Sequence, residues 1–231
     1  MTGIVPIQPI LVFDVNETLL DLSALDPLFE RYLGDARVRK EWFSQVLLIA
    51  FAHTISGPYA DFGAVANAAL DVVQARHHRQ VADDARSHIL GTLRRLSPHP
   101  DAEGGLRRLR DGGLRLVTLT NSTVQVAEAQ LAHAGLRHHF EHVFSADAVR
   151  RLKPAPEPYR MVAGELGVET ASLLLVAAHA WDVGGALGAG CRAAFIQRPG
   201  QVLDALTPTP AYVATDLHEL ADQLLRQGPR S

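Results

Sequence analysis

Four polar side chains follow short apolar runs in the sequence, and together they could carry out nucleophilic and acid-base chemistry. They are Asp14 after 10–13, Thr120 at the end of 114–120, Lys153 downstream of 142–145, and Asp182 downstream of 173–177. Such apolar runs are typical of strands that are buried on both faces of a parallel sheet. The carboxyl ends of these strands lie at one edge of the sheet, where their loops form ligand sites. We therefore expect two carboxylates, a hydroxyl and an ammonium group to meet in one site.

Asp14 is the residue around which such a site would be built. Its charge would be costly to bury without a partner, and a nearby lysine ammonium would favour the carboxylate form. Each signal taken singly has a simpler explanation, because an Asp often caps a turn, Ser122 can serve as a helix N-cap, and a lone lysine is usually solvated. The ordered set of four strand ends outweighs these separate explanations.

The other elements follow from the same periodicity. Strands are expected at 10–15, 114–120, 142–145, 173–177, 193–196 and 212–214, and helices at 102–110, 124–134 and 157–166. Gly135 and Gly167 stand where two of these helices would end. The alternation of strands and helices predicts an α/β fold with a Rossmann-like parallel sheet and helices on both faces.

A long stretch after the first strand interrupts this alternation. It shows helical periodicity at 39–53, 60–76 and 81–96 and no convincing strand. The Ser-Pro-His-Pro run at 97–100 marks the return to the sheet. We predict an inserted helical cap domain at 22–96 and an α/β core domain formed by 1–21 and 97–231.

Composition argues against several classes of partner. The chain of 231 residues is 47% apolar and 20% charged, with a formal net charge of −3 and no basic block, so no nucleic-acid partner is expected. No apolar run reaches the ~18 residues that span a bilayer, and residues 1–13 lack the features of a signal peptide, so no membrane partner is expected. With Cys191 as the single cysteine, we predict a cytoplasmic protein without an intrachain disulfide.

The chain resembles the haloacid dehalogenase superfamily over nearly its whole length. The four motifs of that superfamily match Asp14 with Thr18, then Thr120-Asn121, Lys153-Pro154, and Asp182. The resemblance is narrower still to the type II, or L-2-haloacid, dehalogenases, as judged from Tyr59, Phe62, Tyr159 and the triplet Ala180-Trp181-Asp182. This resemblance implies a metal-independent hydrolase without a cofactor, usually a homodimer, that breaks the carbon–halogen bond at C2 of a short 2-haloacid.

The resemblance also implies roles for the matching residues. Asp14 would displace the halide in an SN2 reaction and form an ester, while Lys153 would hold Asp14 ionised. Asp182, together with Lys153, would orient or activate the water that hydrolyses the ester. The side chains expected to position Asp14 or to bind the substrate are Thr18, Thr120, Asn121 and Tyr159.

Asn16 distinguishes this chain from the magnesium phosphatases of the superfamily. Those enzymes carry a second Asp in the first motif, which protonates the leaving alkoxide; Asn16 cannot do so, and a halide needs no proton. The fourth motif offers Asp182 without a second acid for Mg²⁺, which prefers carboxylate oxygens. No metal site is therefore expected. A magnesium-dependent phosphatase, with Glu17 as the acidic substitute, is the alternative.

The chain also departs from the type II pattern at two positions. Phe43 stands where those enzymes carry the Arg that receives the halide, and His179 stands where they carry Asn. His179 would either bind water or halide in the site or pack behind it, and Trp181 is expected chiefly to pack. Candidate replacements for the missing Arg are Arg39, Lys40, Gln45 and His53.

The bulk of Trp42 and Phe43 predicts a tight apolar pocket suited to small substrates such as haloacetates. The missing Arg leaves a further alternative, a protein that keeps the fold but has little dehalogenase activity. The buried charges of Asp14, Lys153 and Asp182 argue against it, because such groups are costly to retain without use.

Overall fold

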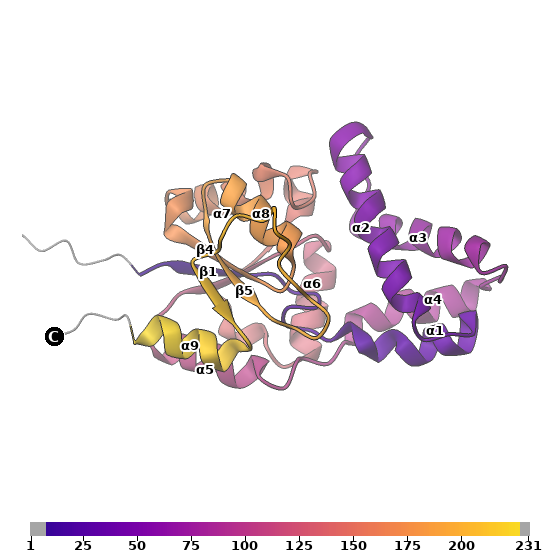
Figure 1. Cartoon of the computed structure of the whole chain (residues 1–231), viewed down its shortest axis with the longest axis horizontal. Helices are drawn as coiled ribbons and strands as arrows, with labels where there is room; N and C mark the ends of the chain where they lie inside the picture. The colour runs from indigo at the N-terminus through magenta and orange to yellow at the C-terminus, as the bar shows by residue number, and fades with distance from the viewer. Residues whose placement is uncertain (1–7, 227–231) are drawn as a thin grey trace, which may run out of the picture.

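The computed structural model describes residues 8–226 and is built around a six-stranded, all-parallel sheet (Figure 1). The order of strands across the sheet is β3-β2-β1-β4-β5-β6. The strands are β1 (Ile10–Phe13), β2 (Leu116–Thr120), β3 (His142–Ser145), β4 (Leu173–Ala177), β5 (Arg192–Ile196) and β6 (Tyr212–Ala214). All six lie where the apolar runs predicted them, which confirms the expected α/β sheet.

Different helices cover the two faces of this sheet. One face packs against α5 (Ala102–Asp111), α6 (Val124–His133) and α9 (Leu217–Leu225), and the other against α7 (Pro156–Leu166) and α8 (Ala180–Gly188). Successive strand residues point to opposite faces, so Leu11 and Phe13 of β1 join the first core while Ile10 and Val12 join the second. Burial on both faces explains why the strands are continuously apolar.

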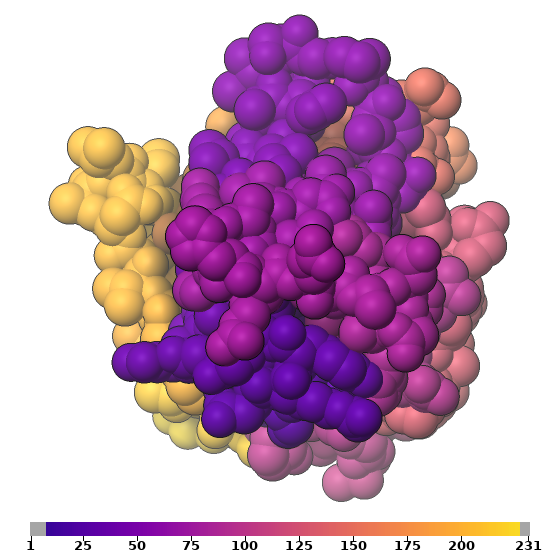
Figure 2. All heavy atoms as spheres, turned by 90° about the vertical axis from the view of Figure 1, so that its right-hand side faces the viewer, coloured from indigo at the N-terminus to yellow at the C-terminus, as the bar shows by residue number. Residues whose placement is uncertain are grey.

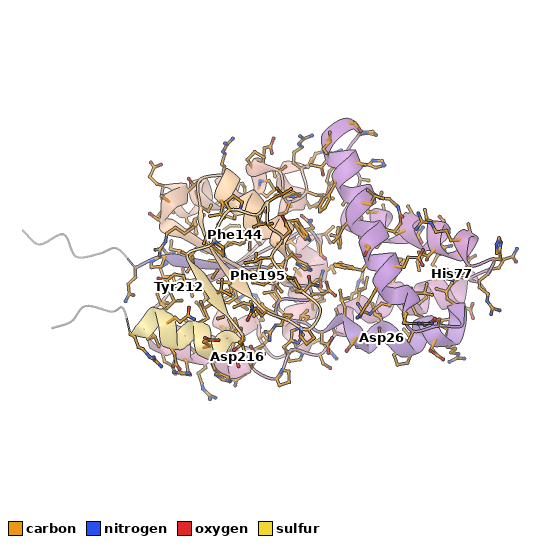
Figure 3. All side chains as sticks on the ribbon, viewed as in Figure 1. Asp26, His77, Phe144, Phe195, Tyr212 and Asp216 are labelled. Carbon is orange, nitrogen blue, oxygen red and sulfur yellow. The ribbon has the colours of Figure 1, made fainter. Side chains whose placement is uncertain are left out.

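A second lobe, composed of helices, is inserted between β1 and β2. Its helices are α1 (Asp26–Leu33), α2 (Val38–Ser56), α3 (Phe62–Arg76) and α4 (Asp83–Thr92), and it lies at the right of Figure 1. Viewed from that side, its helices cover the middle of the molecule (Figure 2). Asp26 and His77 lie in this lobe, whereas Phe195 and Tyr212 lie in the sheet lobe (Figure 3).

The chain leaves and re-enters the sheet lobe at adjacent points. Leu20 forms an antiparallel bridge with Pro98, and the Asp21 backbone N–H donates to the Ser97 carbonyl oxygen at 2.9 Å. Short 3-10 helices complete the structure at η1 (Leu22–Leu25), η2 (Leu93–Arg95), η3 (Arg137–His139), η4 (Ala146–Val149) and η5 (Thr170–Ser172).

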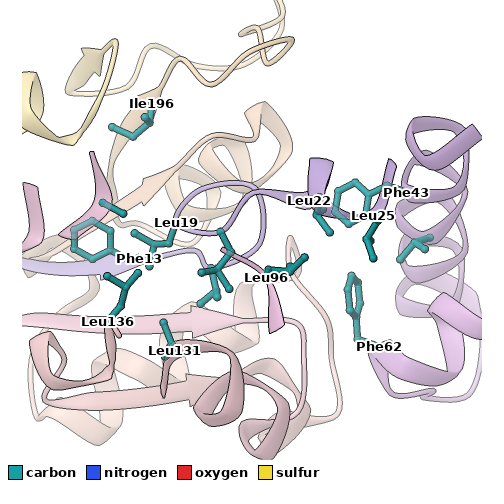
Figure 4. Close-up of a cluster of buried hydrophobic side chains, with 14 of the residues drawn as sticks. Phe13, Leu19, Leu22, Leu25, Phe43, Phe62, Leu96, Leu131, Leu136 and Ile196 are labelled. Carbon is teal, nitrogen blue, oxygen red and sulfur yellow. The ribbon is translucent and has the colours of Figure 1, made fainter. Parts of the chain in front are cut away.

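One apolar core continues from the sheet into the helical lobe. Phe13 and Leu19 on the sheet side belong to the same buried cluster as Leu22, Phe43 and Phe62 at the lobe (Figure 4). The two lobes therefore meet at an apolar seam beside the end of β1. None of the helices within residues 8–226 combines the length and apolarity needed to cross a bilayer.

Candidate active site

Asp14 lies at the carboxyl end of β1, where the sequence predicts it. Its backbone N–H donates to the Val176 carbonyl oxygen of β4 at 3.0 Å, which fixes the residue at the edge of the sheet. The side chain is buried and both carboxylate oxygens have partners. Oδ1 accepts a hydrogen bond from Lys153 Nζ at 2.9 Å, and Oδ2 accepts one from the Thr18 hydroxyl at 2.7 Å.

Lys153 precedes α7 and links the two predicted carboxylates. Its side chain is fully buried, and Nζ donates to Asp14 Oδ1 at 2.9 Å, to Asp182 Oδ2 at 2.6 Å and to the Leu119 carbonyl oxygen at 2.9 Å. All three ammonium hydrogens therefore have acceptors. Burial alone would lower the pKa of Lys153, but the charges of Asp14 and Asp182 raise it above 10.5, so the ammonium form is retained.

The two carboxylates on either side of Lys153 have different environments. Burial would raise the pKa of Asp14, but Lys153 and His179 outweigh it and hold that pKa well below its usual range. Burial and the neighbouring Asp14 charge raise the pKa of Asp182. Asp182 is fully buried, and its second oxygen accepts the Tyr159 hydroxyl at 2.5 Å. Asp14 is thus the carboxylate whose ionised form its neighbours favour more strongly, while Asp182 lies behind Lys153.

His179 brings a second positive charge to Asp14. It is 4% exposed; Nδ1 lies 3.3 Å from Asp14 Oδ2 and Nε2 lies 2.9 Å from Glu17 Oε2. Burial would lower the pKa of His179, but the hydrogen bonds to Asp14 and Glu17 raise it to about 9. At neutral pH, the imidazolium donates one hydrogen bond to each carboxylate. His179 therefore faces the site rather than packing behind it.

Sequence reasoning considered Glu17 only as a substitute acid and missed its contact with His179. The backbone of Glu17 has a φ of 60°, in the left-handed region that non-glycine residues adopt infrequently. This backbone conformation cannot be predicted from the residue type of Glu17. The Glu17 carboxylate also accepts from the Gln201 amide at 3.1 Å and from Arg39 at 3.5 Å, so it is held by three donors.

Three predicted polar side chains turn out to organise the loops around Asp14. The Thr18 hydroxyl donates to Asp14 and accepts the Ala178 N–H at 2.9 Å. Asn121 binds the backbone of Lys153 through two hydrogen bonds. Its Oδ1 accepts the Lys153 N–H at 2.7 Å, and its Nδ2 donates to the Lys153 carbonyl oxygen at 3.3 Å. The Thr120 hydroxyl accepts the Ser122 N–H at 3.2 Å. In this structure, Thr120 and Asn121 contact protein loops, and neither lines a cavity described below.

Arg198 is another residue that the sequence did not single out. Its guanidinium donates to the Thr18 carbonyl oxygen at 2.9 and 3.1 Å and to Asp101 at 2.6 Å. Because Arg198 is buried, it holds the loop that carries Thr18 from the interior of the protein.

Two cavities near the site share Phe43 in their walls. The apolar cavity has a volume of about 420 Å³ and extends along the seam between the lobes; its wall is formed by Asn16, Leu22, Trp42, Phe43, Asp61, Phe62, Gly63, Ala66, Leu90, Leu93, Arg94, Ser122, Thr123, Val126 and Gln130. The polar cavity, about 290 Å³, is lined by Glu17, Arg39, Lys40, Phe43, Ser44, Leu47, His179, Trp181, Pro199, Gly200 and Gln201. Among the described residues, Phe43 alone borders both cavities.

The expectation of a tight pocket at Trp42 and Phe43 is wrong. Both side chains line the apolar cavity instead of filling it, because the Trp42 indole turns toward α3 and donates to the Ala66 carbonyl oxygen at 3.0 Å. Phe43 remains close to the site, with its ring centroid 6.1 Å from that of His179.

The candidate replacements for the missing Arg are placed unequally. Arg39 is buried and pairs with Asp26 at 2.5 Å and Glu17 at 3.5 Å, and Lys40 lines the polar cavity. Gln45 and His53 line neither of the two cavities, and His53 Nδ1 lies 3.2 Å from the Pro58 carbonyl oxygen. His179 is the cationic side chain that reaches Asp14 besides Lys153.

Trp181 packs as expected but also borders the polar cavity. Its ring stacks on His179 with centroids 5.1 Å apart and meets Phe51 edge-on at 5.4 Å. Lys153 Nζ lies 5.8 Å from the centre of the ring. Trp181 therefore helps to fix the orientation of His179.

The acidic side chains at this site are arranged around cations of the protein itself. Asp14 and Asp182 both bind Lys153, and Asp14 and Glu17 both bind His179. Asn16 Nδ2 lies 3.4 Å from the Ser122 hydroxyl, and its carbonyl oxygen accepts from the Gln130 amide at 3.0 Å. Elsewhere in residues 8–226, the ligand atoms of Glu103, His138 and His139 lie close enough to share a metal. That cluster does not include any residue of the Asp14 site.

Comparisons with known proteins place the chain in one family. The model of the haloacid dehalogenase-like hydrolases matches residues 9–190. (S)-2-haloacid dehalogenase H-109 of Pseudomonas putida is 30% identical over 223 residues, which cover 94% of this chain and 99% of that protein. Haloacetate dehalogenase H-2 of Moraxella sp. (strain B) is 29% identical over 87% of this chain and 91% of that protein.

A solved structure agrees with these relatives. The L-2-haloacid dehalogenase of Xanthobacter autotrophicus with chloropropionic acid covalently bound superposes with a TM-score of 0.88 at 27% identity, covering 96% of this chain and all of that one. The family model spans the helical lobe and the strands that carry Asp14, Lys153 and Asp182. The chain therefore belongs to the haloacid dehalogenase-like hydrolase family.

Proposed function

We propose that this protein is a metal-independent 2-haloacid dehalogenase that works through an ester on Asp14. The observation that carries the proposal is the environment of Asp14, a buried carboxylate held ionised between Lys153 and His179, of which His179 lines the polar cavity. An ionised carboxylate is the form that acts as a nucleophile. The (S)-2-haloacid dehalogenases to which the chain is similar support the same reaction.

In the first step, Asp14 attacks C2 of the substrate. Oδ2 already accepts two hydrogen bonds, from Thr18 and His179, whereas Oδ1 accepts one, from Lys153. A carboxylate oxygen has two lone pairs, so Oδ1 is the oxygen with a lone pair available for C2. The Oδ1–C2 bond forms as the carbon–halogen bond breaks, and the halide leaves with the bonding electrons.

In the second step, water attacks Cγ of the Asp14 ester. The Cγ–Oδ1 bond breaks, and Oδ1 departs with C2 as the hydroxyl of a 2-hydroxy acid. Lys153 Nζ, 2.9 Å from Oδ1, donates the proton that the departing oxygen needs and regains one from the new carboxyl group. The net reaction consumes one water and releases the halide and one proton.

The position of Asp182 suggests a role different from the one expected from the sequence. Its two oxygens are occupied by Lys153 and Tyr159, and the residue has no exposed surface through which to reach water. We propose that Asp182 keeps Lys153 charged and oriented when alkylation removes the charge of Asp14. Tyr159 would hold Asp182 in this role, so neither residue would touch the substrate.

The phosphatase alternative has less support from the same contacts. Asn16, at the position where the phosphatases carry a second Asp, has no proton to exchange, and Glu17 turns away from it toward the polar cavity. A cation bound between Asp14 and Asp182 would have to displace the Lys153 ammonium, which already bridges them. Two positive side chains next to Asp14 also oppose the binding of Mg²⁺.

Halide release tests the proposal. Purified protein with EDTA would be incubated with bromoacetate and both enantiomers of 2-chloropropionate, beside a phosphate ester with Mg²⁺. We expect halide release in the presence of EDTA that disappears in Asp14→Asn. Phosphate release that depends on Mg²⁺, without halide, would overturn the proposal in favour of a phosphatase. Inactivity in every arm would indicate a protein that kept the fold without the turnover.

We also propose that residues 22–96 act as a cap domain over Asp14, and that the protein is a cytoplasmic homodimer. Leu48 and Ile55 support a dimer, because they lie seven residues apart on one face of α2 and are 59% and 81% exposed. We expect light scattering to report twice the mass of one chain, and the double variant Leu48→Lys, Ile55→Lys to report one. A monomeric starting protein would refute the dimer.

A further inference from the structure

The apolar cavity is far larger than a haloacetate requires. Its volume of about 420 Å³ falls in the range of pockets that hold drug-sized ligands, roughly 300–1,000 Å³, whereas one water occupies about 30 Å³ of liquid. The wall is mostly aliphatic and aromatic, with Leu22, Phe62, Leu90 and Val126 among its members. It starts at Asn16, two residues from Asp14.

One polar side chain of this wall is held by the protein itself. Gln130 is 1% exposed, and its Nε2 donates to the Leu93 carbonyl oxygen at 2.7 Å and to Asn16 Oδ1 at 3.0 Å. The Leu93 carbonyl oxygen can only accept, so it fixes the orientation of the Gln130 amide. Oε1 is then buried without a partner among the described residues. Since Oε1 has no accessible surface, Gln130 offers a ligand in the cavity no open polar group, which suits an apolar occupant.

We propose that this cavity holds the substituent on C2 of the substrate, so that the preferred substrates are 2-halo acids with a large apolar group rather than haloacetates. The assignment rests on the proposed dehalogenase function for its chemistry. Binding the carboxylate and C2 near Asp14 would place the substituent along the seam, against Phe62, Leu93 and Val126.

Binding and turnover test this assignment separately. The affinities of the halogen-free probes 3-phenylpropionate and propionate would be measured by calorimetry, and kcat/KM would be measured for 2-bromo-3-phenylpropionate and bromoacetate. Burial of a phenyl group predicts that the larger member of each pair is favoured by about 10–100-fold. Val126→Phe should remove most of that preference by filling the cavity. Val124→Phe, on the same helix but exposed and outside the wall, should retain it.

Equal affinity for the two probes, or an unchanged preference in Val126→Phe, would overturn the assignment. A binding preference that Val126→Phe abolishes, without halide release from either bromo acid, would support the cavity and refute the dehalogenase.

A separate observation concerns the second step. If Oδ1 becomes the ester oxygen, then Oδ2 becomes the carbonyl oxygen of the Asp14 ester. Thr18 and His179 already point their donors at Oδ2, from 2.7 and 3.3 Å. When water adds to Cγ, the carbonyl electrons move onto Oδ2, and preorganised donors at such an oxygen stabilise the transition state.

We propose that the Thr18 hydroxyl and the His179 imidazolium form the oxyanion hole for hydrolysis of the ester, with Glu17 as the positioning residue that holds His179 charged. This assignment also rests on the proposed function.

Pre-steady-state kinetics separate the two chemical steps. In His179→Gln we expect a burst of halide equal to the enzyme concentration, followed by turnover slowed about 10²–10³-fold. Intact mass spectrometry should then find the carboxyalkyl group of the substrate attached to the protein through C2. The exposed His133 gives the matched control, His133→Gln, in which turnover should be unchanged. Unchanged turnover in His179→Gln, or a slow halide burst without adduct, would overturn the oxyanion hole.

The pH profile provides a readout that a packing role would not move. The charged and titratable groups that face His179 or share its cavity are Asp14, Glu17, Arg39, Lys40 and Lys153. Loss of the His179 proton should slow decay of the ester as the pH rises, and it should do so below the pKa of about 9 that His179 has beside ionised Asp14, because the ester carries no charge at Asp14. Glu17→Gln should move this alkaline loss to lower pH, since Glu17 is the carboxylate that still raises the pKa of His179 once Asp14 is esterified. Ester decay that accelerates through the same range would instead identify His179 as a general base and refute the proposal.

Absence of any halide release from the unsubstituted protein would refute the dehalogenase function itself. A normal burst with unaltered decay in His179→Gln would refute only the oxyanion hole.

Discussion

Replacement of Lys153 by Met removes the cation that the site is built around. Nζ makes three hydrogen bonds in a fully buried position, two of them to carboxylates. Removing one partner of a buried ion pair typically costs about 3–5 kcal/mol, because the remaining charge stays buried. That is a large part of the ~5–15 kcal/mol that stabilises a typical domain. We expect the free energy of unfolding at pH 7.5 to fall by about this amount.

The direction of the pH dependence makes this prediction specific. Without Lys153, burial and mutual repulsion should raise the pKa values of Asp14 and Asp182 above those of the unfolded chain. The variant should therefore regain stability as the pH falls through the raised values, since protonation of one carboxylate relieves the repulsion. Turnover should fall by about 10²-fold or more, because each lost ~1.4 kcal/mol of transition-state stabilisation is tenfold in rate.

Urea unfolding between pH 5 and 8 measures the stability, and halide release measures the rate. Lys40→Met, which removes an exposed lysine of the polar cavity, is the matched control and should change the unfolding free energy by less than about 0.5 kcal/mol. A Lys153→Met protein that unfolds like the control at pH 7.5, with no gain on acidification, would refute the description of Lys153 as the bridge between two charged groups.

Three further predictions concern other side chains of the Asp14 site. Thr18→Val removes a donor to Asp14 and leaves the buried Ala178 N–H without an acceptor. This variant should lower the free energy of unfolding in urea by about 1–3 kcal/mol and should reduce kcat. An unaffected kcat would show that the hydroxyl is dispensable. Tyr159→Phe should destabilise the protein by a similar amount but reduce kcat less than Lys153→Met, because Tyr159 acts through Asp182; an equal loss would mean direct contact with the substrate. The stability contributed by protonated His179 should be complete below pH 6.5 and be lost as the pH rises through about 9; a His179→Gln protein with the same alkaline loss would contradict this.

The strands could be predicted from the sequence because they are buried on both faces, which leaves continuous apolar runs. Helix α8 could not, because its segment contains Gly184, Gly185 and Gly188, which disfavour isolated helices. Packing explains Gly185: a Cβ there would lie 2.6 Å from the Cβ of Pro154 and 2.7 Å from the Tyr159 hydroxyl. Helix α9 was not predicted either, although Asp216 and Glu219 have the spacing of an N-terminal cap and Asp216 does accept the Glu219 N–H.

The part of the site that lies at the ends of strands could be predicted from the sequence. The part that depends on the backbone conformation of the loops could not. Asp14, Lys153 and Asp182 meet because parallel strands deliver their carboxyl ends to one edge. The contact between Glu17 and His179 depends on a left-handed backbone at Glu17, which residue type does not indicate. The extent of the apolar cavity likewise depends on how the helical lobe sits on the sheet lobe, and no local pattern encodes that arrangement.

Helix α1 (Asp26–Leu33) shows a similar limit. Its segment was assigned to the helical stretch without a helix of its own, although Pro27 stands near its start and Gly34 ends it with a φ of 86°. Phe29 anchors it by packing on Trp42, with ring centroids 5.4 Å apart. This contact between segments, rather than local propensity, stabilises a helix of only eight residues.

Isotope labelling of a single turnover tests the ester on Asp14 most directly. Enzyme in excess over a 2-halo acid would react once in water enriched in ¹⁸O, and both the product and the peptide that contains Asp14 would be weighed. Water attack on Cγ leaves the heavy oxygen in the Asp14 carboxylate and gives a 2-hydroxy acid without label. A labelled hydroxyl in the product, with unlabelled Asp14, would mean that water attacks C2 directly and would contradict covalent catalysis by Asp14.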